Sequence, residues 1–263
     1  MIPPLQSLQP PAPLLDVADV TLQHRAGGRR VVATDRVAFR VGEGERVALL
    51  GPSGCGKSTL LKAIAGFLRP SGGRITLRGS EIAGPGPDRV VVFQEFDQLL
   101  PWKTVQENVV FALTHARGLR RDEALAIARH HLHRVNLAAF AHAYPHELSG
   151  GMKQRVAIAR CLALKPEIVL MDEPFGALDA LTRERMQDEL IDLWREARFT
   201  LLFVTHDIGE ALRIGSRVVL LSPHPGRVRA DLRVGEGPLA ILGDAAQAHV
   251  RDLLFEGAQD WTI

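Results

Sequence analysis

One segment constrains the fold of this chain more than any other. An apolar run, Arg46–Leu50, passes directly into a glycine-rich loop at residues 51–58, and a helical pattern follows over residues 58–67. A short apolar run without alternation is typical of a strand buried on both faces of a parallel sheet. The segment therefore predicts a buried strand, a tight turn and a helix, which together form the repeating unit of an α/β protein.

The rest of the chain extends this pattern. Short apolar runs at residues 90–93, 168–171 and 201–204 predict further buried strands, and the last two lead into polar turns and then helices. This alternation indicates an α/β core with a parallel sheet. Residues 104–139 carry apolar side chains at i, i+3 and i+4 spacing, which predicts a helical subdomain at about 100–160.

The flanking regions differ from this core. Residues 15–20 and 31–39 alternate between apolar and polar side chains around Gly27-Gly28, which predicts antiparallel strands and so a small β subdomain. Residues 1–14 hold five prolines and predict a disordered lead-in. We expect the main domain to span residues 15–228 and a short C-terminal extension to follow over residues 229–263.

Composition argues against several classes of protein. Charged residues make up 24% of the chain, hydrophobic residues 46%, and the net charge is only +2. Because no dense run of Lys and Arg is present, we expect no nucleic-acid partner. The N-terminus lacks the pattern of a signal peptide, and no apolar run approaches the roughly 20 residues of a membrane helix. We therefore expect that the chain is not an integral membrane protein.

The chain has two cysteines, and their positions argue against a structural disulfide. Cys55 lies inside the glycine-rich loop and Cys161 in a helical segment. A reducing compartment fits this pair better than an oxidising one. We expect Cys161 to be a small, buried, apolar side chain.

The glycine-rich loop carries the pattern G-x-x-x-x-G-K-[ST]. Its glycines let the backbone turn tightly, so that N–H groups and the positive end of the next helix point at phosphate oxygens. We expect Lys57 to reach the β- and γ-phosphates of ATP and the Ser58 hydroxyl to bind Mg²⁺. The predicted phosphate-binding residues are Gly51, Pro52, Ser53, Gly54, Cys55, Gly56, Lys57, Ser58 and Thr59.

The apolar run at residues 168–171 ends in two carboxylates, Asp172 and Glu173. Because side chains alternate along an extended strand, adjacent acids point in different directions. We expect Asp172 to bind Mg²⁺ and Glu173 to act as the general base toward the attacking water. The pair therefore predicts hydrolysis of ATP as well as binding.

A second glycine-containing helix start lies at Ser149-Gly150-Gly151. Ser149 is placed as an N-cap, and the two glycines leave backbone N–H groups uncovered, so the same electrostatics predict a second anion site. One ATP does not need two such sites within one subunit. The simplest interpretation is that Ser149, Gly150 and Gly151 close over a nucleotide held by another copy of the chain.

Together these segments resemble the ATP-binding proteins of ABC transporters. Residues 148–151 are similar to the signature motif of that family, and the other motifs follow in the family's order over residues 15–225. The resemblance implies the ABC ATPase fold, a P-loop NTPase core with an antiparallel β subdomain and a helical subdomain. It also implies a head-to-tail homodimer that holds ATP and Mg²⁺ between the P-loop of one copy and the signature of the other.

The resemblance assigns roles to further residues. Gln94 resembles the Q-loop glutamine, which contacts Mg²⁺ and the attacking water, and His206 resembles the switch histidine, which touches the γ-phosphate. Residues 176–179 resemble the D-loop, which communicates between the paired sites. The expected catalytic residues are Glu173, His206, Gln94 and Lys57, and the expected metal ligands are Ser58, Gln94 and Asp172.

The adenine contact departs from the family's pattern. ABC ATPases usually place an aromatic side chain in the first β segment, where it stacks on adenine. The matching residues 20–25 contain neither Tyr nor Phe. We expect His24 to stack on the base, with Arg25 as the alternative.

A narrower resemblance connects the chain to importers of nitrate, sulfonates and taurine. It is carried by residues 84–89, 93–94, 99–102, 172–179 and 223–228. It implies a peripheral ATPase at the cytoplasmic face of the inner membrane, which energises integral membrane permease subunits and depends indirectly on a periplasmic or surface substrate-binding protein.

Two expectations concern exposed side chains. Leu99, Leu100, Pro101 and Trp102 are expected to form an exposed apolar anchor for the permease; alternatively, Trp102 packs into the helical subdomain.

Three histidines, His130, His131 and His133, have i, i+1, i+3 spacing on one helix. This spacing aims them at different faces, so we expect a solvated helix rather than a metal site.

Two other functions stay open. One is an ATPase of an exporter or of a lipid-trafficking system. The other is a soluble ABC ATPase of DNA repair or translation, although such proteins usually carry two cassettes, or coiled-coil or zinc-bearing insertions, none of which is recognisable here.

Overall fold

The computed structural model describes residues 12–26, 29–94, 98–236 and 243–255. Its largest sheet has six strands in the order β10-β9-β3-β8-β7-β6. All neighbouring strands pair in parallel except β10, which is antiparallel to β9. The strands are β3 (Arg46–Leu50), β6 (Arg89–Val92), β7 (Ile168–Asp172), β8 (Thr200–Thr205), β9 (Arg217–Leu221) and β10 (Val228–Arg233). The predicted α/β core with a parallel sheet is confirmed.

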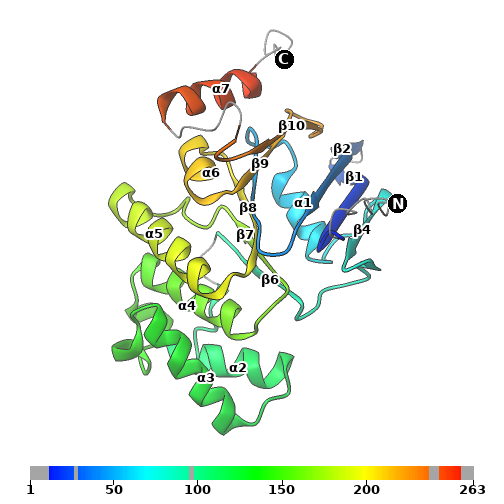
Figure 1. The fold of residues 1–263 in the computed structure, drawn as a ribbon. Helices are drawn as coiled ribbons and strands as arrows, with labels where there is room; N and C mark the ends of the chain where they lie inside the picture. The colour runs from blue at the N-terminus through cyan, green and yellow to red at the C-terminus, as the bar shows by residue number, and fades with distance from the viewer. Residues whose placement is uncertain (1–11, 27–28, 95–97, 237–242, 256–263) are drawn as a thin grey trace, which may run out of the picture.

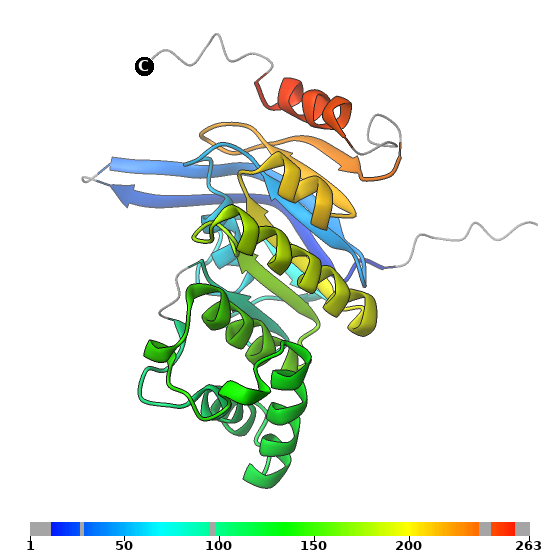
Figure 2. The same ribbon diagram turned by 90° about the vertical axis from the view of Figure 1, so that its left-hand side faces the viewer.

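A second sheet has four strands in the order β2-β1-β4-β5 (Figure 2). Its strands are β1 (Leu15–Ala26), β2 (Arg29–Val41), β4 (Gly72–Leu77) and β5 (Ser80–Glu81). β1 and β2 pair antiparallel along their length, as the alternation predicted. The turn expected at Gly27-Gly28 and residues 1–11 of the predicted lead-in lie outside the described residues.

The helices occupy both faces of the six-stranded sheet (Figure 1). They are α1 (Lys57–Ile64), α2 (Val105–Ala116), α3 (Arg121–Arg134), α4 (Gly150–Ala163), α5 (Ala180–Ala197), α6 (Ile208–Ile214) and α7 (Asp244–Phe255), with short 3₁₀ turns at Ala138–Phe140 and Pro145–Glu147. α2, α3 and α4 contact one another and form the helical subdomain. α1 ends earlier than predicted, because Gly66 adopts a left-handed φ of 86°.

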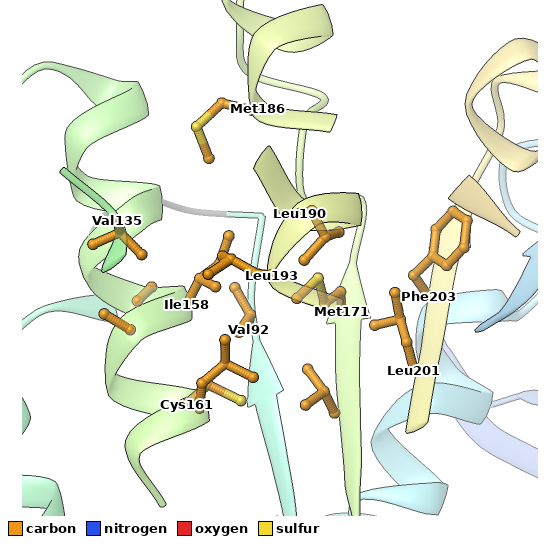
Figure 3. Close-up of a cluster of buried hydrophobic side chains, with 14 of the residues drawn as sticks. Val92, Val135, Ile158, Cys161, Met171, Met186, Leu190, Leu193, Leu201 and Phe203 are labelled. Carbon is orange, nitrogen blue, oxygen red and sulfur yellow. The ribbon is translucent and has the colours of Figure 1, made fainter. Parts of the chain in front are cut away.

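Alternating side chains of the central strands build two separate cores. On β8, Leu201 faces the core that the sheet shares with α4 and α5, whereas Leu202 faces the core shared with α1 and the antiparallel sheet. Figure 3 shows the first of these cores, where Ile158, Met171 and Leu190 meet from three different elements. Both cores consist of buried apolar side chains, which explains why the strands are continuous apolar runs.

Two helical side chains test the expectations about burial. Cys161 on α4 is buried among apolar side chains, as predicted. The expectation of a fully solvated histidine cluster is wrong for His131, which is only 8% exposed, whereas His130 and His133 are exposed. The reason is helical spacing: His131 follows the buried Ala128 by three residues and so lies on the face of α3 that packs inward.

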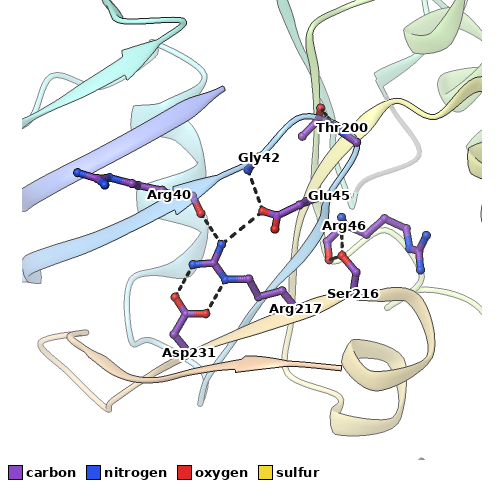
Figure 4. A network of polar contacts seen from close by, with 9 residues as sticks. Arg40, Gly42, Glu45, Arg46, Thr200, Ser216, Arg217 and Asp231 are labelled. Carbon is purple, nitrogen blue, oxygen red and sulfur yellow. Dashed lines mark hydrogen bonds and ion pairs between the residues drawn. The ribbon is translucent and has the colours of Figure 1, made fainter. Parts of the chain in front are cut away.

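The C-terminal region is joined to the core. The predicted boundary at residue 228 falls inside β10, which Arg217 on β9 holds through a bond from Nε to Asp231 Oδ1 (2.6 Å; Figure 4). A terminal nitrogen of Arg217 also donates to Arg40 O of β2 (2.8 Å). α7 buries Ala246, Val250 and Leu254 against the core. Among the helices of the described residues, none is both long and apolar enough to cross a membrane.

Candidate nucleotide site

Four neighbouring parallel strands end at one edge of the sheet. β3 leads into the glycine-rich loop, β8 into His206, β7 into Glu173, and β6 into Gln94. Since parallel strands present their carboxyl ends at the same edge, the topology brings these distant segments together. This edge is the candidate nucleotide site.

At two positions, the glycine-rich loop has a backbone conformation that only glycine adopts easily. Gly54 and Gly56 have φ of 79° and 95°, and Gly56 immediately precedes α1. A Cβ on Gly56 would lie 2.6 Å from Ala33 O of β2, so the loop lies too close to that strand for a side chain. Thr59 follows in the first turn of α1. The loop thus keeps the turn geometry and the open helix start that phosphate binding requires.

Residues 222–227 contact both the loop and the neighbouring strand β2. Gly226 donates its N–H to Ala33 O (3.0 Å), and a Cβ on Gly226 would lie 2.2 Å from Cys55 O. Sequence reasoning used this segment only for a family resemblance and missed its contact with the loop. The isolated Gly226 was the available signal, because an isolated glycine often marks a close backbone approach.

Lys57 is buried beneath the loop. Its Nζ donates to Gly51 O (2.7 Å) and Pro52 O (2.9 Å). Burial raises the pKa of the adjacent Cys55 thiol, although the neighbouring ammonium works in the opposite direction. The cysteine therefore stays a neutral thiol, and the positive charge of Lys57 lies at the loop's own carbonyls.

Ser58 and Asp172 meet across the site. Ser58 Oγ donates to Asp172 Oδ1 at 2.7 Å, from the first turn of α1 to the end of β7. Burial raises the pKa of Asp172, and the bond from Ser58 opposes this rise. A half-buried carboxylate beside a hydroxyl is the all-oxygen donor set that Mg²⁺ prefers, and a cation there would offset the cost of burying the charge. The residues present therefore fit a bound Mg²⁺.

Glu173 turns away from Asp172. Its φ is 42°, and its carboxylate Oε2 lies 3.2 Å from Nδ1 of His206. A Cβ on Gly176 would lie 3.0 Å from Nε2 of Gln94 and 3.6 Å from Oε2 of Glu173, so both side chains converge on this glycine. The two acids contact different partners, but the strand alternation behind the prediction does not reach Glu173, which follows β7. Glu173, His206 and Gln94 form one cluster.

The second helix start is not part of this cluster. Ser149 caps α4, since its Oγ accepts from Met152 N at 3.3 Å. A Cβ on Gly151 would lie 3.1 Å from Thr182 Cγ2 of α5. Within the described residues, no hydrogen bond joins residues 149–151 to the glycine-rich loop, and Figures 1 and 2 show α4 on the other side of the sheet from α1. A single chain thus keeps the two anion-binding helix starts apart.

His24, the residue expected to contact adenine, pairs with β2 close to the point where β2 approaches the glycine-rich loop. His24 is exposed on β1 and pairs with Val31 of β2, two residues before Ala33, which approaches Gly56. The side chain of the alternative, Arg25, lies outside the described part of the chain. This register gives His24 a position on the same hairpin that supports the loop.

Sequence reasoning missed a polar network behind His206. Glu210, which is 7% exposed, accepts from Thr205 Oγ1 (2.9 Å), and Thr205 Oγ1 accepts from Asp207 N (3.0 Å). The available signal was Asp207-x-x-Glu210 at a helix start, a pattern typical of a capping box. The carboxylate of Glu210 bonds to Thr205 instead, and so it fixes the turn that carries His206.

The expected apolar anchor is only partly exposed. Trp102 is 71% exposed, so the alternative in which it packs into the helical subdomain is wrong. Leu99 is only 3% exposed and belongs to the core shared by the helices, so its expected exposure is also wrong. The exposed part of this segment is therefore Pro101-Trp102.

Comparison with known proteins points to one family. Residues 34–176 match the family model described as ABC transporter. The chain is 57% identical to the taurine import ATP-binding protein TauB of Rhizobium johnstonii over 203 residues, which is 77% of each chain. It is 50% identical to the nitrate import ATP-binding protein NrtD of Synechococcus elongatus over 217 residues, 82% of this chain and 74% of the other.

Solved structures give the same result for the fold. An ATP-binding cassette solved as a dimer in a post-hydrolysis state, bound to ADP and Pi, is 34% identical with a TM-score of 0.73; the match covers 85% of this chain and 99% of that one. The cbiO1 subunit of a Clostridium perfringens ABC transporter complex is 26% identical with a TM-score of 0.75, and the match covers 94% of both chains.

Proposed function

This chain belongs to the ABC transporter family, and we propose that it is the ATP-hydrolysing subunit of an importer for a small oxyanion or organosulfonate. The observation that carries the proposal is the meeting of Lys57, Ser58, Asp172, Glu173 and His206 at one edge of the parallel sheet. The relatives named for taurine and nitrate import support the class of cargo.

In this proposal residues 51–59 hold the phosphates of ATP through backbone N–H groups, and Lys57 provides the positive charge beside the transferred phosphoryl group. Ser58, Asp172 and Gln94 would hold Mg²⁺, which when bound neutralises charge on the β- and γ-phosphates. The hydrogen bond between Ser58 and Asp172 keeps both oxygen donors in place before substrate arrives.

Glu173 accepts a proton from the attacking water in the proposed reaction. The carboxylate lies 3.2 Å from His206, so the imidazole orients the base and can donate to a γ-phosphate oxygen. Gln94 approaches the same point from β6 and would orient the water. Each of these groups comes from a different strand end, so the sheet itself sets their spacing.

The proposed active form is a head-to-tail homodimer. Ser149, Gly150 and Gly151 cap α4 away from the loop of their own chain, and in a second copy they would close over the γ-phosphate. His24 would stack on adenine from the hairpin. The dimeric cassette among the solved structures supports this arrangement.

The proposal places the protein at the cytoplasmic face of the inner membrane, as a peripheral subunit. Integral permease subunits would dock at Trp102, and a periplasmic or surface binding protein would act through them. The high exposure of Trp102 supports this role, because a large apolar side chain in water is typical of an interface anchor.

The variant Glu173→Gln tests the active site. Removing the base while keeping the shape should lower steady-state ATP hydrolysis by roughly a hundredfold or more, while ATP binding persists. Size-exclusion chromatography with ATP should then show a dimer. Glu123→Gln, an exposed change on α3, is the matched control and should hydrolyse ATP normally.

Equal ATPase rates in the wild type and Glu173→Gln would contradict the assignment of the base. The cargo is tested separately by deleting the gene and measuring growth on single sulfur or nitrogen sources. Normal growth on every sulfonate and on nitrate would contradict the importer class, and stable association of the purified protein with ribosomes or DNA would do the same.

A further inference from the structure

A cavity lies at the edge of the sheet opposite the candidate nucleotide site. It has a volume of about 780 Å³ and lies beside Thr200, the first residue of β8, and Glu167, which precedes β7. These are the amino ends of the strands, whereas the nucleotide site lies at their carboxyl ends. One wall comes from α3 and the end of α4, and the other from residues 197–200 at the end of α5 and the start of β8. The cavity therefore lies between the helical subdomain and the core.

The lining carries an excess of positive charge. Its basic side chains are Arg78, Arg134, Lys165 and Arg198, and its carboxylates are Glu43 and Glu167. Arg78 pairs with both carboxylates, and Arg134 pairs with Glu196 outside the lining. Within the described ranges, no carboxylate lies at ion-pair distance from Lys165 or Arg198. Two cations are thus left to attract a negative group.

Lys165 and Arg198 both follow the end of a helix and have an uncommon backbone conformation. Lys165 follows α4 with φ of 46°, and Arg198 follows α5 with φ of 49°, positions where glycine is usual. Arg117 donates to Leu164 O and Lys165 O and so covers the carbonyls at the end of α4. The negative end of that helix is therefore partly neutralised, which leaves the Lys165 charge available to an anion.

One of the two cations, Arg198, is restrained by a ring contact. The Arg198 guanidinium lies 4.4 Å from the ring centre of Trp194. On the same wall, Gly44 N donates to Thr200 Oγ1 (3.0 Å), which anchors the turn that carries Glu43, and Gly42 N donates to Glu45 Oε2 (2.8 Å; Figure 4). Arg198 and the turn that carries Glu43 are thus held in place by contacts within the chain.

The interior of the cavity is apolar. Ile127, Leu162 and Phe199 line it together with two alanines, Ala126 and Ala197. His131 also faces this space; burial lowers its pKa to about 4, so its ring is neutral near pH 7. An inorganic ion would leave this surface uncovered, whereas a molecule with an apolar body would fill it.

We propose that this cavity binds a small organic anion, a carboxylate or sulfonate with an apolar body, whose negative group lies between Lys165 and Arg198. The site does not overlap the nucleotide site. Because its walls belong to the helical subdomain and to the core, a bound anion ties the two together and changes the rate at which ATP closes the dimer.

Isothermal titration calorimetry of the full chain with phenylmethanesulfonate tests the proposal. We expect saturable one-site binding to the free protein and to the Glu173→Gln variant alike. The neutral phenylmethanesulfonamide and inorganic sulfate should each bind at least roughly fivefold more weakly. A variant with Trp102→Phe and Trp261→Phe leaves Trp194 as the sole tryptophan, and its fluorescence should change on binding.

Two variants locate the site. Lys165→Gly and Arg198→Gly each remove a charge and suit the left-handed backbone, so the fold should survive, as thermal unfolding will check. Each should weaken binding of the sulfonate roughly fivefold to tenfold. Arg129→Gln, an exposed change on α3 outside the lining, should leave the affinity unchanged.

Absence of binding at sulfonate concentrations up to about 10 mM would overturn the proposal. So would equal affinity for the neutral sulfonamide, or equal affinity in both glycine variants and the wild type. Binding that disappears when ATP occupies the P-loop, with affinity unchanged in both glycine variants, would assign the anion to the nucleotide site instead. Because Glu173→Gln is included, failure of the proposed hydrolytic role would not affect this result.

Discussion

At the scale of residues, two buried titratable side chains set opposite dependences of stability on pH. His131 on α3 has a pKa lowered to about 4 by burial and by neighbouring positive charges. Glu210 on α6 has a pKa raised to about 7, first by burial, with Asp207 adding to the rise and Thr205 opposing it. Each group is neutral in the folded protein over a range where it is charged in the unfolded chain.

We predict that His131→Asn makes the protein less sensitive to mild acid. The neutral imidazole contributes stability that is fully present above pH 6.5 and is lost as pH falls toward 4, because the unfolded chain binds the proton first. Thermal unfolding measured between pH 7 and pH 4 should show a smaller decline in the variant. His133→Asn, on the exposed side of the same helix, should behave like the wild type.

The prediction for Glu210→Gln has the opposite sign. The protonated carboxyl contributes stability that is fully present below pH 4.5 and is lost as pH rises through 7. The melting temperature of Glu210→Gln minus that of the wild type should therefore be larger at pH 8 than at pH 5. Glu184→Gln on the exposed side of α5 is the control, and an identical shift there would contradict the argument.

At the scale of elements, α2 fixes the segment that carries Trp102. Asn108 is fully buried; its amide donates to Leu100 O, Lys103 O and Thr104 O and accepts from Leu100 N. One side chain thus satisfies several backbone groups in a loop that has no regular structure of its own. The proposed docking surface is therefore tied to α2 through Asn108.

We predict that Asn108→Ala destabilises the protein by about 2 kcal/mol, since it leaves buried backbone groups unpaired. Thr104→Ala removes only the N-cap of α2 and should cost about 1 kcal/mol. Chemical denaturation measures both changes. ATP hydrolysis by the isolated subunit should survive in each variant, and a greater loss in Thr104→Ala would contradict the role given to Asn108.

At the scale of the whole molecule, the six-stranded sheet joins two hydrophobic cores. Adjacent residues on β8 contribute to different cores, so neither core can open without disturbing the strand that both share. The described part of the chain is therefore expected to unfold cooperatively, although the antiparallel sheet and the helical subdomain lie on opposite sides (Figure 1).

The matched pair Leu201→Ala and Leu202→Ala tests this coupling. Both side chains are fully buried, on opposite faces of β8, and each loss should cost about 2–5 kcal/mol. Unfolding followed by circular dichroism and by calorimetry should show one transition, shifted downward by a similar amount in both variants. A separate early transition in only one of them would mean that the two cores unfold independently.

Several parts of this molecule follow from local sequence. The buried strands of the α/β core, the antiparallel hairpin and the cap at Ser149 were predicted because each depends on residues within a few positions of one another. The resemblance to ABC ATPases likewise rests on short motifs, and the match to that family confirms it. Roles of individual site residues, such as Glu173, stay predictions until they are measured.

Other properties were decided only when distant segments packed together. Sequence placed His131 on a solvated helix and left residues 222–227 without a contact, whereas the fold buries the histidine and places Gly226 against the glycine-rich loop. The cavity beside Lys165 and Arg198 likewise exists only because the ends of α4 and α5 meet the side of α3 there. The sequence alone determined which local elements form, since backbone propensity and periodicity act over a few residues. Burial, strand order and cavities depend on contacts between segments tens of residues apart, which only the tertiary structure specifies.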